Sequence, residues 1–410
     1  IPGVPWDSSF VRIFCPVPGM GGRRAGFKWL WSFYHRAYVF YKKVCERHSM
    51  EKIRELIDRL ESQRILTKEE FCFLIESIEP EDREYLYERA RSQARAVYGN
   101  AIYVRGLIEF TNFCRNDCYY CGIRRGNRQA SRYRLTREEI LECCKEGYAL
   151  GFRTFVLQGG EDPWFDDDKI AGLVREIKEA YPDCAVTLSV GEHSYETYKK
   201  WFDAGADRYL LRHETANPEH YAKLHPSAMS LAHRMQCLRN LKAIGYQTGC
   251  GIMAGSPWQT SENLAEDLLF MRDLEPEMVG IGPFIPHHET PFKDKAPGTL
   301  ELTLLLLSIV RLMLPRVLLP ATTALGTIDP TGREQGVLAG ANVVMPNLSP
   351  LNVRKKYMLY DNKISTGAEA ASNIAELRQR MEAIGYEVAV GRGDYPGSKV
   401  IPSAPSTSRS

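Results

Sequence analysis

The 410-residue sequence has no charge of dominant sign and no apolar run long enough to cross a bilayer. Its 53 basic and 51 acidic residues leave a net charge of +2, which excludes a strong global field for nucleic acid or acidic partners. The most apolar stretch, Leu302 to Leu319, is interrupted by Arg311, Pro315 and Arg316. We therefore expect neither nucleic-acid binding nor insertion into a membrane.

The cysteine pattern also lacks the features of a disulfide framework. The eleven cysteines are odd in number and scattered, and no secretory start precedes them, which favours a reducing, cytoplasmic location. Residues 1–49 are basic, rich in aromatic residues and poor in acids. This composition resembles an organelle transit segment, so an anaerobic organelle is the alternative location; a disordered extension fits equally well.

No second C-x2-C or Cys/His pair accompanies the cysteines at positions 114, 118 and 121, which argues against a closed zinc site. Their C-x3-C-x2-C spacing can place three thiolates on a [4Fe–4S] cluster and leave one iron without a protein ligand. S-adenosylmethionine (SAM) can chelate that iron, and one-electron transfer then releases a 5′-deoxyadenosyl radical. Cys114, Cys118 and Cys121 are therefore the predicted metal ligands of a radical-SAM site, with three unrelated thiols as the alternative.

Short apolar runs alternate with helical patterns from residue 102 onward. A G-x-G-x-x-G motif is missing after the first run, which argues against a doubly wound sheet. Eight strands joined by helices are typical of a complete (βα)8 barrel in the α/β class, with chemistry just after the strands' carboxyl ends. The expected strands are Ile102 to Phe110, Thr154 to Gln158, Ala185 to Val190, Arg208 to Leu211, Gln247 to Met253, Met278 to Ile281, Val317 to Ala321 and Asn342 to Met345.

The remaining patterns divide the chain around this barrel. Capping boxes beginning at Thr67 and Thr136 predict helix starts, and a C-terminal helix is expected from Gly367 to Gly385. The expected parts are an extension or leader over 1–49, helices packed on the barrel over 50–100, the barrel over 101–350, a C-terminal extension over 351–395 and a disordered tail over 396–410.

The turn after the second expected strand reads Gln158-Gly159-Gly160-Glu161. Two glycines let the backbone approach a ligand closely, so this turn could hold the amino group of SAM, although a plain strand-to-helix turn explains it as well. Tyr120, just before the last cysteine of the loop, is placed to contact the adenine; an ordinary exposed tyrosine is the alternative.

Charged and hydroxyl side chains follow later strands. Arg208, Arg212 and Glu214 near the fourth strand must pair with one another or meet a charged ligand. Thr322 and Thr323 after the seventh strand offer hydroxyls and backbone N–H groups to a substrate carboxylate, or cap the next helix.

Four longer motifs resemble the HydE family of [FeFe]-hydrogenase maturases, which are similar to biotin synthase and methylornithine synthase. They read IEFTNFC at 108–114, RHETANP at 212–218, GIGPFIPH at 280–287 and PATTALGT at 320–327, and the resemblance extends roughly from Met50 to Gly393. It implies one [4Fe–4S] cluster on three cysteines, and SAM as cofactor. It also implies that Gln158, Glu214 and Arg234 contact SAM.

The resemblance further implies a substrate site and a reaction. Arg208, Thr322 and Thr323 would bind a substrate carboxylate, and Met253, Tyr357 and Tyr360 would line the cavity. The adenosyl radical would act on a sulfur-bearing, cysteine-derived iron carbonyl/cyanide precursor of the hydrogenase diiron subcluster. Other maturases and an external electron donor would be the partners.

One departure from the family concerns the C-terminal region. Some members have three more cysteines there for an accessory cluster, but the matching stretch, Tyr360 to Met381, has none, so a second cluster is not expected. Two alternative functions stay open: an amino-acid mutase resembling methylornithine synthase, and a non-catalytic carrier of an iron–sulfur precursor.

Overall fold

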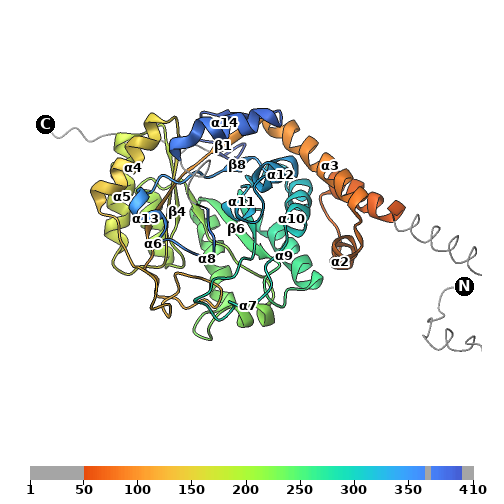
Figure 1. Cartoon of the computed structure of the whole chain (residues 1–410), viewed down its shortest axis with the longest axis horizontal. Helices are drawn as coiled ribbons and strands as arrows, with labels where there is room; N and C mark the ends of the chain where they lie inside the picture. The colour runs from red at the N-terminus through yellow and green to blue at the C-terminus, as the bar shows by residue number, and fades with distance from the viewer. Residues whose placement is uncertain (1–49, 365–370, 399–410) are drawn as a thin grey trace, which may run out of the picture. The chain divides into compact units, whose positions relative to one another are not determined.

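The computed structural model describes residues 50–364 and 371–398, so the expected extension over 1–49 and most of the expected tail lie outside the described residues. From Ile53 onward the described chain belongs to one compact unit. Parallel strands alternate with helices that cover them on the outside (Figure 1). The α/β class predicted from the sequence is confirmed.

Six parallel strands form the larger sheet, in the order β2-β3-β4-β5-β6-β7. Each pairs with its neighbour in the sequence, as expected when a helix connects each strand to the next. Most of their side chains are buried, because helices cover the outer face and packed residues fill the inner one. Their bounds are Gly106–Thr111, Thr154–Gly159, Ala185–Ser189, Arg208–Leu210, Gln247–Ala254 and Met278–Pro283.

A second sheet of three parallel strands has the order β8-β1-β9. Isolated parallel bridges connect it to the larger sheet: Met278 pairs with Leu318, Pro320 with Val343, and Leu107 with Asn347. The expected seventh strand, 317–321, is represented only by two of these bridges. The three strands are β8 (Val343–Val344), β1 (Ala101–Val104) and β9 (Glu387–Ala389).

Two features of this second sheet differ from the sequence prediction. The expected strand from Ile102 to Phe110 is broken at Arg105, because the residues before it pair with β8 and β9 and those after it pair with β3. Strand β9 was not predicted at all. Its residues Glu387 and Ala389 are not fully buried, so it has no continuous apolar pattern to identify it.

Most helices begin where the sequence has a capping residue. The predicted capping boxes at Thr67 and Thr136 are both present, with each threonine side chain accepting from the N3 backbone amide and the N3 glutamate accepting in return. The described helices after residue 63 are α2 (Lys68–Ser77), α3 (Pro80–Tyr98), α4 (Arg137–Ala149), α5 (Asp167–Ala180), α6 (Tyr195–Asp203), α7 (Pro218–Leu224), α8 (Leu231–Ile244), α9 (Ser261–Leu274), α10 (Leu300–Met313), α11 (Thr323–Ile328), α12 (Gly332–Leu338), α13 (Leu351–Arg354) and α14 (Ile374–Ala383).

The N-terminal helices pack against the outer layer of helices. Helix α2 contacts α9, and α3 contacts α10 and α12, on the right-hand side of Figure 1. Phe71, Leu74 and Leu86 are fully buried in these contacts and join the main hydrophobic core. Within the described residues, none of the helices has the length and apolar content that crossing a membrane requires.

Candidate functional site

The loop after β2 carries the three predicted cluster ligands. Cys114, Cys118 and Cys121 are all partly buried and not in disulfides. Burial raises the pKa of each thiol, and neighbouring thiols add to it: Cys121 and Cys114 raise the pKa of Cys118, and Cys114 raises that of Cys121. The structure therefore brings the three thiols together at the carboxyl end of the larger sheet.

A single arginine fixes the shape of this loop. Arg132 donates through Nη1 to the carbonyls of Asn112 and of Ile123 (2.8 Å), and through Nη2 to those of Arg124 (2.6 Å) and Asn127 (3.1 Å). Its pKa is lowered by burial, while the thiols of the first and third cysteines act in the opposite direction. Arg132 thus holds four backbone carbonyls and places a positive charge beside the thiols.

Two glycines allow the backbone to pass close to the loop. A Cβ atom on Gly160 would lie 2.2 Å from the carbonyl oxygen of Phe113 and 2.7 Å from Cβ of Cys114. A Cβ atom on Gly122 would lie 2.1 Å from the carbonyl oxygen of Met358. Both contacts exclude a side chain, so the turn after β3 and the segment after α13 pack directly on the cysteine loop.

The predicted SAM residues of the β3 turn fall into two groups. Gln158 and Gly159 end β3, and Nε2 of Gln158 donates to the hydroxyl of Tyr357 at 3.3 Å. Glu161 instead accepts from Nε of Arg115 (2.9 Å) and from the backbone amide of Glu192 (2.9 Å). Because both carboxylate oxygens bind protein groups, Glu161 orders the cysteine loop, and its contact with SAM stays a prediction.

Tyr120 faces the same region from the cysteine loop. Its hydroxyl lies 3.1 Å from Nε2 of His225, whose Nδ1 lies 3.1 Å from the carbonyl oxygen of Tyr221. Since Nδ1 must donate to that carbonyl, Nε2 accepts from Tyr120. Burial lowers the pKa of His225 to about 3, so this histidine is neutral. Burial raises the pKa of Tyr120, and the nearby groups Glu214 and Cys118 raise it further. The Tyr120 ring therefore lies near one predicted SAM residue and one predicted cluster ligand.

Arg234, on α8, joins Glu192 to the end of β5. Its Nε pairs with Glu192, and Nη1 donates to the carbonyl oxygen of Arg212 at 2.6 Å. Burial opposes its charge, but Glu192 holds the pKa of Arg234 well above its usual value. The guanidinium is therefore a fixed positive charge at this end of the sheet.

Arg212 lies at the same end; the sequence left open whether it pairs with a neighbour or meets a charged ligand. Its Nη2 pairs with Glu214 at 3.0 Å, and its Nε is buried without a hydrogen-bond partner. Glu214 has a left-handed backbone (φ 65°) and donates its amide to the carbonyl oxygen of Gly251 at 3.0 Å. A strained non-glycine residue and an unsatisfied guanidinium N–H are features of a ligand site.

Arg208 lies at the opposite end of the strand. It is fully buried, with Nη2 2.6 Å from Asp394, Nη1 3.0 Å from Thr154 and Nε 3.2 Å from Gln247. Thr154, Arg208 and Gln247 are the first residues of β3, β5 and β6. The structure therefore does not bring Arg208 together with the other predicted substrate residues, which lie past the carboxyl ends.

The bounds of β5 separate the two arginines: Arg208 is the first residue of the strand, and Arg212 lies two residues past its end. Four residues of extended chain span roughly 13 Å, at about 3.3 Å per residue, so the two side chains can lie at opposite ends of the sheet. Counting positions from the start of the strand would have assigned Arg212, and not Arg208, to the carboxyl end.

The predicted residues after β6 and β7 lie at the carboxyl end as expected. Oγ1 of Thr322 is buried without a hydrogen-bond partner, and it would lie 2.9 Å from a Cβ atom on Gly282 of β7. Thr323 begins α11. Met253, the last residue but one of β6, packs in a small apolar cluster that Tyr120 joins. The Thr322 hydroxyl and the apolar cluster of Met253 thus both lie at the carboxyl end of the strands.

Residues 357–364 cover this end. Tyr357 is fully buried, and Nζ of Lys363 lies 5.2 Å from the centre of its ring and 2.6 Å from Oε1 of Glu109. Tyr360 is partly buried in the same segment. The buried Glu109–Lys363 pair fixes this cover to β2. The predicted cavity residues Tyr357 and Tyr360 therefore belong to the cover.

One further group of possible metal ligands holds the cover in place. Ligand atoms of His287, His288 and Asp361 lie within 4.8 Å of one another. The two imidazole rings are stacked, with centres 4.5 Å apart and planes at 17°, so their in-plane lone pairs do not converge on one point. Nδ1 of His288 is 2.7 Å from Asp361, and this contact ties residues 357–364 to the loop after β7.

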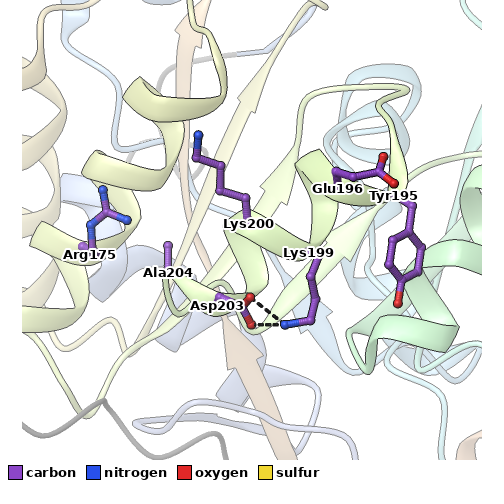
Figure 2. Close-up of a pocket in the computed structure, with 7 residues that line it drawn as sticks. All are labelled: Arg175, Tyr195, Glu196, Lys199, Lys200, Asp203 and Ala204. Atoms are coloured by element: carbon purple, nitrogen blue, oxygen red, sulfur yellow. Dashed lines mark hydrogen bonds and ion pairs between the residues drawn. The ribbon is translucent and has the colours of Figure 1, made fainter.

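A surface hollow on α5 and α6 contains none of the predicted site residues (Figure 2). Its side chains pair with acids on the same surface: Nζ of Lys199 lies 2.6 Å from Oδ2 of Asp203, and Nζ of Lys200 lies 2.7 Å from Asp168. Arg175, Tyr195, Glu196 and Ala204 complete the lining. The hollow is a solvated, charge-balanced surface, and the chemistry belongs to the carboxyl end of the strands.

Comparison with known proteins identifies the class of this site. The family model described as "Radical SAM superfamily" matches residues 108–271, a stretch that includes the cysteine loop, Gln158, Glu214 and Arg234. The fold and the cysteine loop are those of a radical SAM enzyme.

Individual relatives give the branch of this superfamily. The chain is 45% identical to the [FeFe] hydrogenase maturase subunit HydE of Thermotoga maritima, over 85% of this chain and 98% of the relative. It is 30% identical to the 3-methylornithine synthase of Methanosarcina barkeri, over 84% and 97%. The crystal structure of methylornithine synthase (PylB) superposes with a TM-score of 0.73 at 29% identity, covering 82% of this chain and 97% of that one. The chain belongs to the HydE family of hydrogenase maturases.

Membership of this superfamily implies a [4Fe–4S] cluster and SAM, and the residues present fit both groups. Three partly buried thiols lie together beside the guanidinium of Arg132, as a thiolate-bound cluster requires. Gly160 leaves room for backbone against Cys114, and Arg212 leaves an N–H unsatisfied nearby in the fold.

Proposed function

We propose that this radical SAM enzyme acts in the assembly of the [FeFe]-hydrogenase diiron subcluster, on a cysteine-derived, sulfur-bearing iron carbonyl/cyanide precursor. When bound, the cluster and SAM supply a 5′-deoxyadenosyl radical by one-electron cleavage of the sulfonium. The observation that carries the proposal is the 45% identity to HydE over nearly the whole relative, and the cysteine loop and the unpaired groups of Arg212 and Thr322 at the carboxyl ends of the strands support it.

The residues of the chain take separate tasks in this proposal. Cys114, Cys118 and Cys121 hold a single cluster, and six further residues would bind SAM. They are Tyr120, Gln158, Gly159, Gly160, Glu214 and Arg234. The buried positive charge of Arg234 favours an anionic or zwitterionic ligand at this end of the strands.

A carboxylate of the substrate would bind deeper, between β5 and the turn before α11. Arg212 offers an unsatisfied Nε–H, and Thr322 an unsatisfied hydroxyl. Backbone and side chain of Thr323 complete this anion site, and Met253, Tyr357 and Tyr360 exclude water around it. In this proposal the two sheets, with their three bridges, act as one (βα)8 barrel closed by residues 357–364.

The test is reductive SAM cleavage by the anaerobically reconstituted protein. Wild type should form 5′-deoxyadenosine, and Cys118→Ser should reduce that product to background because one cluster ligand is lost. Cys72→Ser is the matched control, since Cys72 is a partly buried thiol on α2, remote in sequence from the cysteine loop. Unchanged cleavage by Cys118→Ser would contradict the assignment.

The substrate needs its own test, because methylornithine synthase is also a relative at 30% identity. Omitting this protein from a hydrogenase maturation assay should remove hydrogenase activity. Turnover of lysine, with maturation unaffected by the omission, would instead favour an amino-acid mutase. A cluster whose EPR signal does not respond to SAM would favour a non-catalytic carrier.

A further inference from the structure

The outer surface of the cysteine loop has an excess of positive charge that the proposed function does not use. Residues 114–134 contain six arginines and a single acid, Asp117. The arginines are Arg115, Arg124, Arg125, Arg128, Arg132 and Arg134. An excess of this kind within one short loop contrasts with a net charge of +2 for the whole chain.

Acidic neighbours neutralise only part of this charge. Asp117 pairs with Arg124 at 2.7 Å, and Glu161 pairs with Arg115 at 2.9 Å. Asp162, which is buried, pairs with Arg134 at 2.6 Å. These three acids leave three of the six arginines without a carboxylate.

The arginines that remain have different surroundings. Arg132 is committed to the backbone of the loop. Arg125 and Arg128 are exposed, and no carboxylate within ion-pair distance is found for either among the described residues. Their charge therefore lies in solvent, on the same loop as the thiols that would hold the cluster, where it can attract an acidic surface.

An exposed aromatic side chain continues this surface. Trp164 is 47% exposed, and the guanidinium carbon of Arg134 lies 5.7 Å from the centre of its ring. The same guanidinium lies 3.8 Å from the ring of Phe113, which precedes Cys114 in the chain. Tryptophan and arginine are the residue types most enriched at the centres of protein interfaces. Contacts thus connect the exposed Trp164, through Arg134, to Phe113, the residue before the first cluster ligand.

Acids at the start of α5 limit the extent of this surface. Asp166 pairs with Lys169 at 2.9 Å, and Lys169 lies over the ring of Trp164. Asp168 is 84% exposed but pairs with Lys200 at 2.7 Å. Positive charge therefore predominates on the side of Trp164 that faces the cysteine loop.

We propose that Arg115, Arg125, Arg128, Arg134 and Trp164 form the docking face for an acidic one-electron carrier protein. The inference rests on the proposed function, which consumes one electron from outside for each SAM cleaved. In the transfer step the carrier is oxidised by one electron and the cluster is reduced by one, and no proton or covalent bond is exchanged. The exposed arginines steer the acidic carrier to the face of the protein nearest the cluster.

The experiment measures cluster reduction by stopped-flow absorbance, with the reconstituted holoenzyme and either reduced plant-type ferredoxin or dithionite. Arg125→Glu/Arg128→Glu should lower the second-order rate constant with ferredoxin at least tenfold at low salt. It should leave the reaction with dithionite within twofold of wild type. The wild-type rate with ferredoxin should fall as salt is added, because screening weakens steering, and the variant should depend less on salt.

Arg175→Glu/Arg239→Glu is the matched control. It changes the net charge by the same amount at two exposed helical arginines, on α5 and α8, and should alter the ferredoxin rate less than twofold. Trp164→Ala should lower that rate about fivefold without changing its salt dependence, because an apolar contact is lost and no charge is changed.

Two outcomes separate this inference from the proposed function. Equal ferredoxin rates for the two double variants would overturn the docking face. The same result is expected if this face binds RNA instead, because electron delivery would then not depend on the charges at 125 and 128. A wild-type enzyme that fails to cleave SAM with either reductant would overturn the proposed function itself.

Discussion

The two ends of the larger sheet differ in how their polar groups are satisfied. At the amino ends, Arg208 binds Asp394, Thr154 and Gln247, and its side chain is fully buried. At the carboxyl ends, the Nε of Arg212 and the hydroxyl of Thr322 are buried without partners. Buried polar groups are normally paired within the protein, so the two unpaired groups here support the proposal that a ligand binds at the carboxyl ends.

Charge follows the same division. Asp394 also pairs with Arg392 at 2.7 Å, and Arg392 pairs with Asp207 at 2.7 Å, so the C-terminal segment closes the amino ends with alternating charges. Burial opposes ionisation of Asp394, but Arg392 and Arg208 hold its pKa well below the usual value. Arg105 is the exception at this end, because its Nε and Nη2 lack partners. Apart from Arg105, the charged groups named at the amino ends thus pair within the protein, whereas the proposed ligand-binding groups lie at the carboxyl ends.

The largest expected effect comes from breaking the closed end. Arg208→Met should lower the free energy of unfolding by about 3 kcal/mol, because Asp394 loses one of two cations in a buried site. Cleavage of SAM by the folded fraction should stay within twofold of wild type. Urea denaturation of the apoprotein and 5′-deoxyadenosine assays measure the two quantities.

Arg212→Met is the matched change at the open end. It should cost under about 1 kcal/mol, because its side chain is 33% exposed and has one ion pair, with Glu214. Substrate-dependent turnover should fall at least tenfold. If Arg208→Met abolished substrate binding and Arg212→Met did not, the assignment of the two ends would be reversed.

The next effect concerns the close packing on the cysteine loop. Gly160→Ala should cost roughly 1–3 kcal/mol and displace Cys114, because the added methyl group meets the Phe113 carbonyl and the cysteine side chain. Iron content after reconstitution should fall with it. Gly172→Ala is the control: no atom lies within 4 Å of its Cβ position on α5, and alanine there should stabilise by about 0.5–1 kcal/mol. Normal iron content in Gly160→Ala would show that the loop can move without loss of the cluster.

His225 predicts a pH dependence at the open end. Its pKa falls from 6.5 to about 3 on folding because the imidazole is buried. The unfolded state therefore binds a proton below pH 6.5 that the folded state does not. Each unit of pH below 6.5 should cost about 1.4 kcal/mol of stability, until the pH approaches 3.

The measurement compares wild type with His225→Gln. A glutamine cannot be protonated, so the difference in unfolding free energy between the two proteins should shrink by about 2 kcal/mol from pH 6.5 to pH 5. Subtracting the variant removes the contribution of other buried histidines, which titrate in both proteins. Parallel curves would mean that His225 is already charged in the native protein.

The smallest expected effect tests the unpaired hydroxyl. Thr322→Val should leave stability unchanged or raise it by up to about 1 kcal/mol, since it removes a buried group without a partner. Thr303→Val should cost about 1 kcal/mol, because the Thr303 hydroxyl donates to Thr299 at 2.8 Å. A loss of stability in Thr322→Val comparable to that in Thr303→Val would show that the hydroxyl at 322 has a protein partner.

The sequence predicted the parts of this protein that depend on local chemistry. The cysteine loop after β2, the capping boxes at Thr67 and Thr136, and six of the strands follow from spacing, side-chain oxygens and apolar runs. It did not predict β9, whose stability comes from pairing with β1 and not from its own residues. Nor did it predict the break at Arg105, where the chain changes from one sheet to the other.

For the site, the types of residue involved were easier to predict than where each residue lies along its strand. Arg208 and Arg212 are the same residue type four positions apart, and only the bounds of β5 (Arg208–Leu210) show that the first begins the strand and the second follows it. Glu161 was predicted to bind a ligand, yet its carboxylate binds Arg115 and the amide of Glu192. Partners that come from distant segments, such as Asp394 for Arg208, cannot be identified from local patterns.

The pairing of β1 with β9 bears on how the protein is synthesised. Ala101 and Glu387 are partners in the register, and Arg392 and Asp394 follow β9 directly. At about 10 residues per second, β1 leaves the ribosome on the order of half a minute before its neighbour exists. During that interval the edge of β1 that pairs with β9 is open, and Arg208 lacks the carboxylate of Asp394. A chain that stopped before residue 387 would therefore leave this edge of β1 unpaired and open to pairing with another chain.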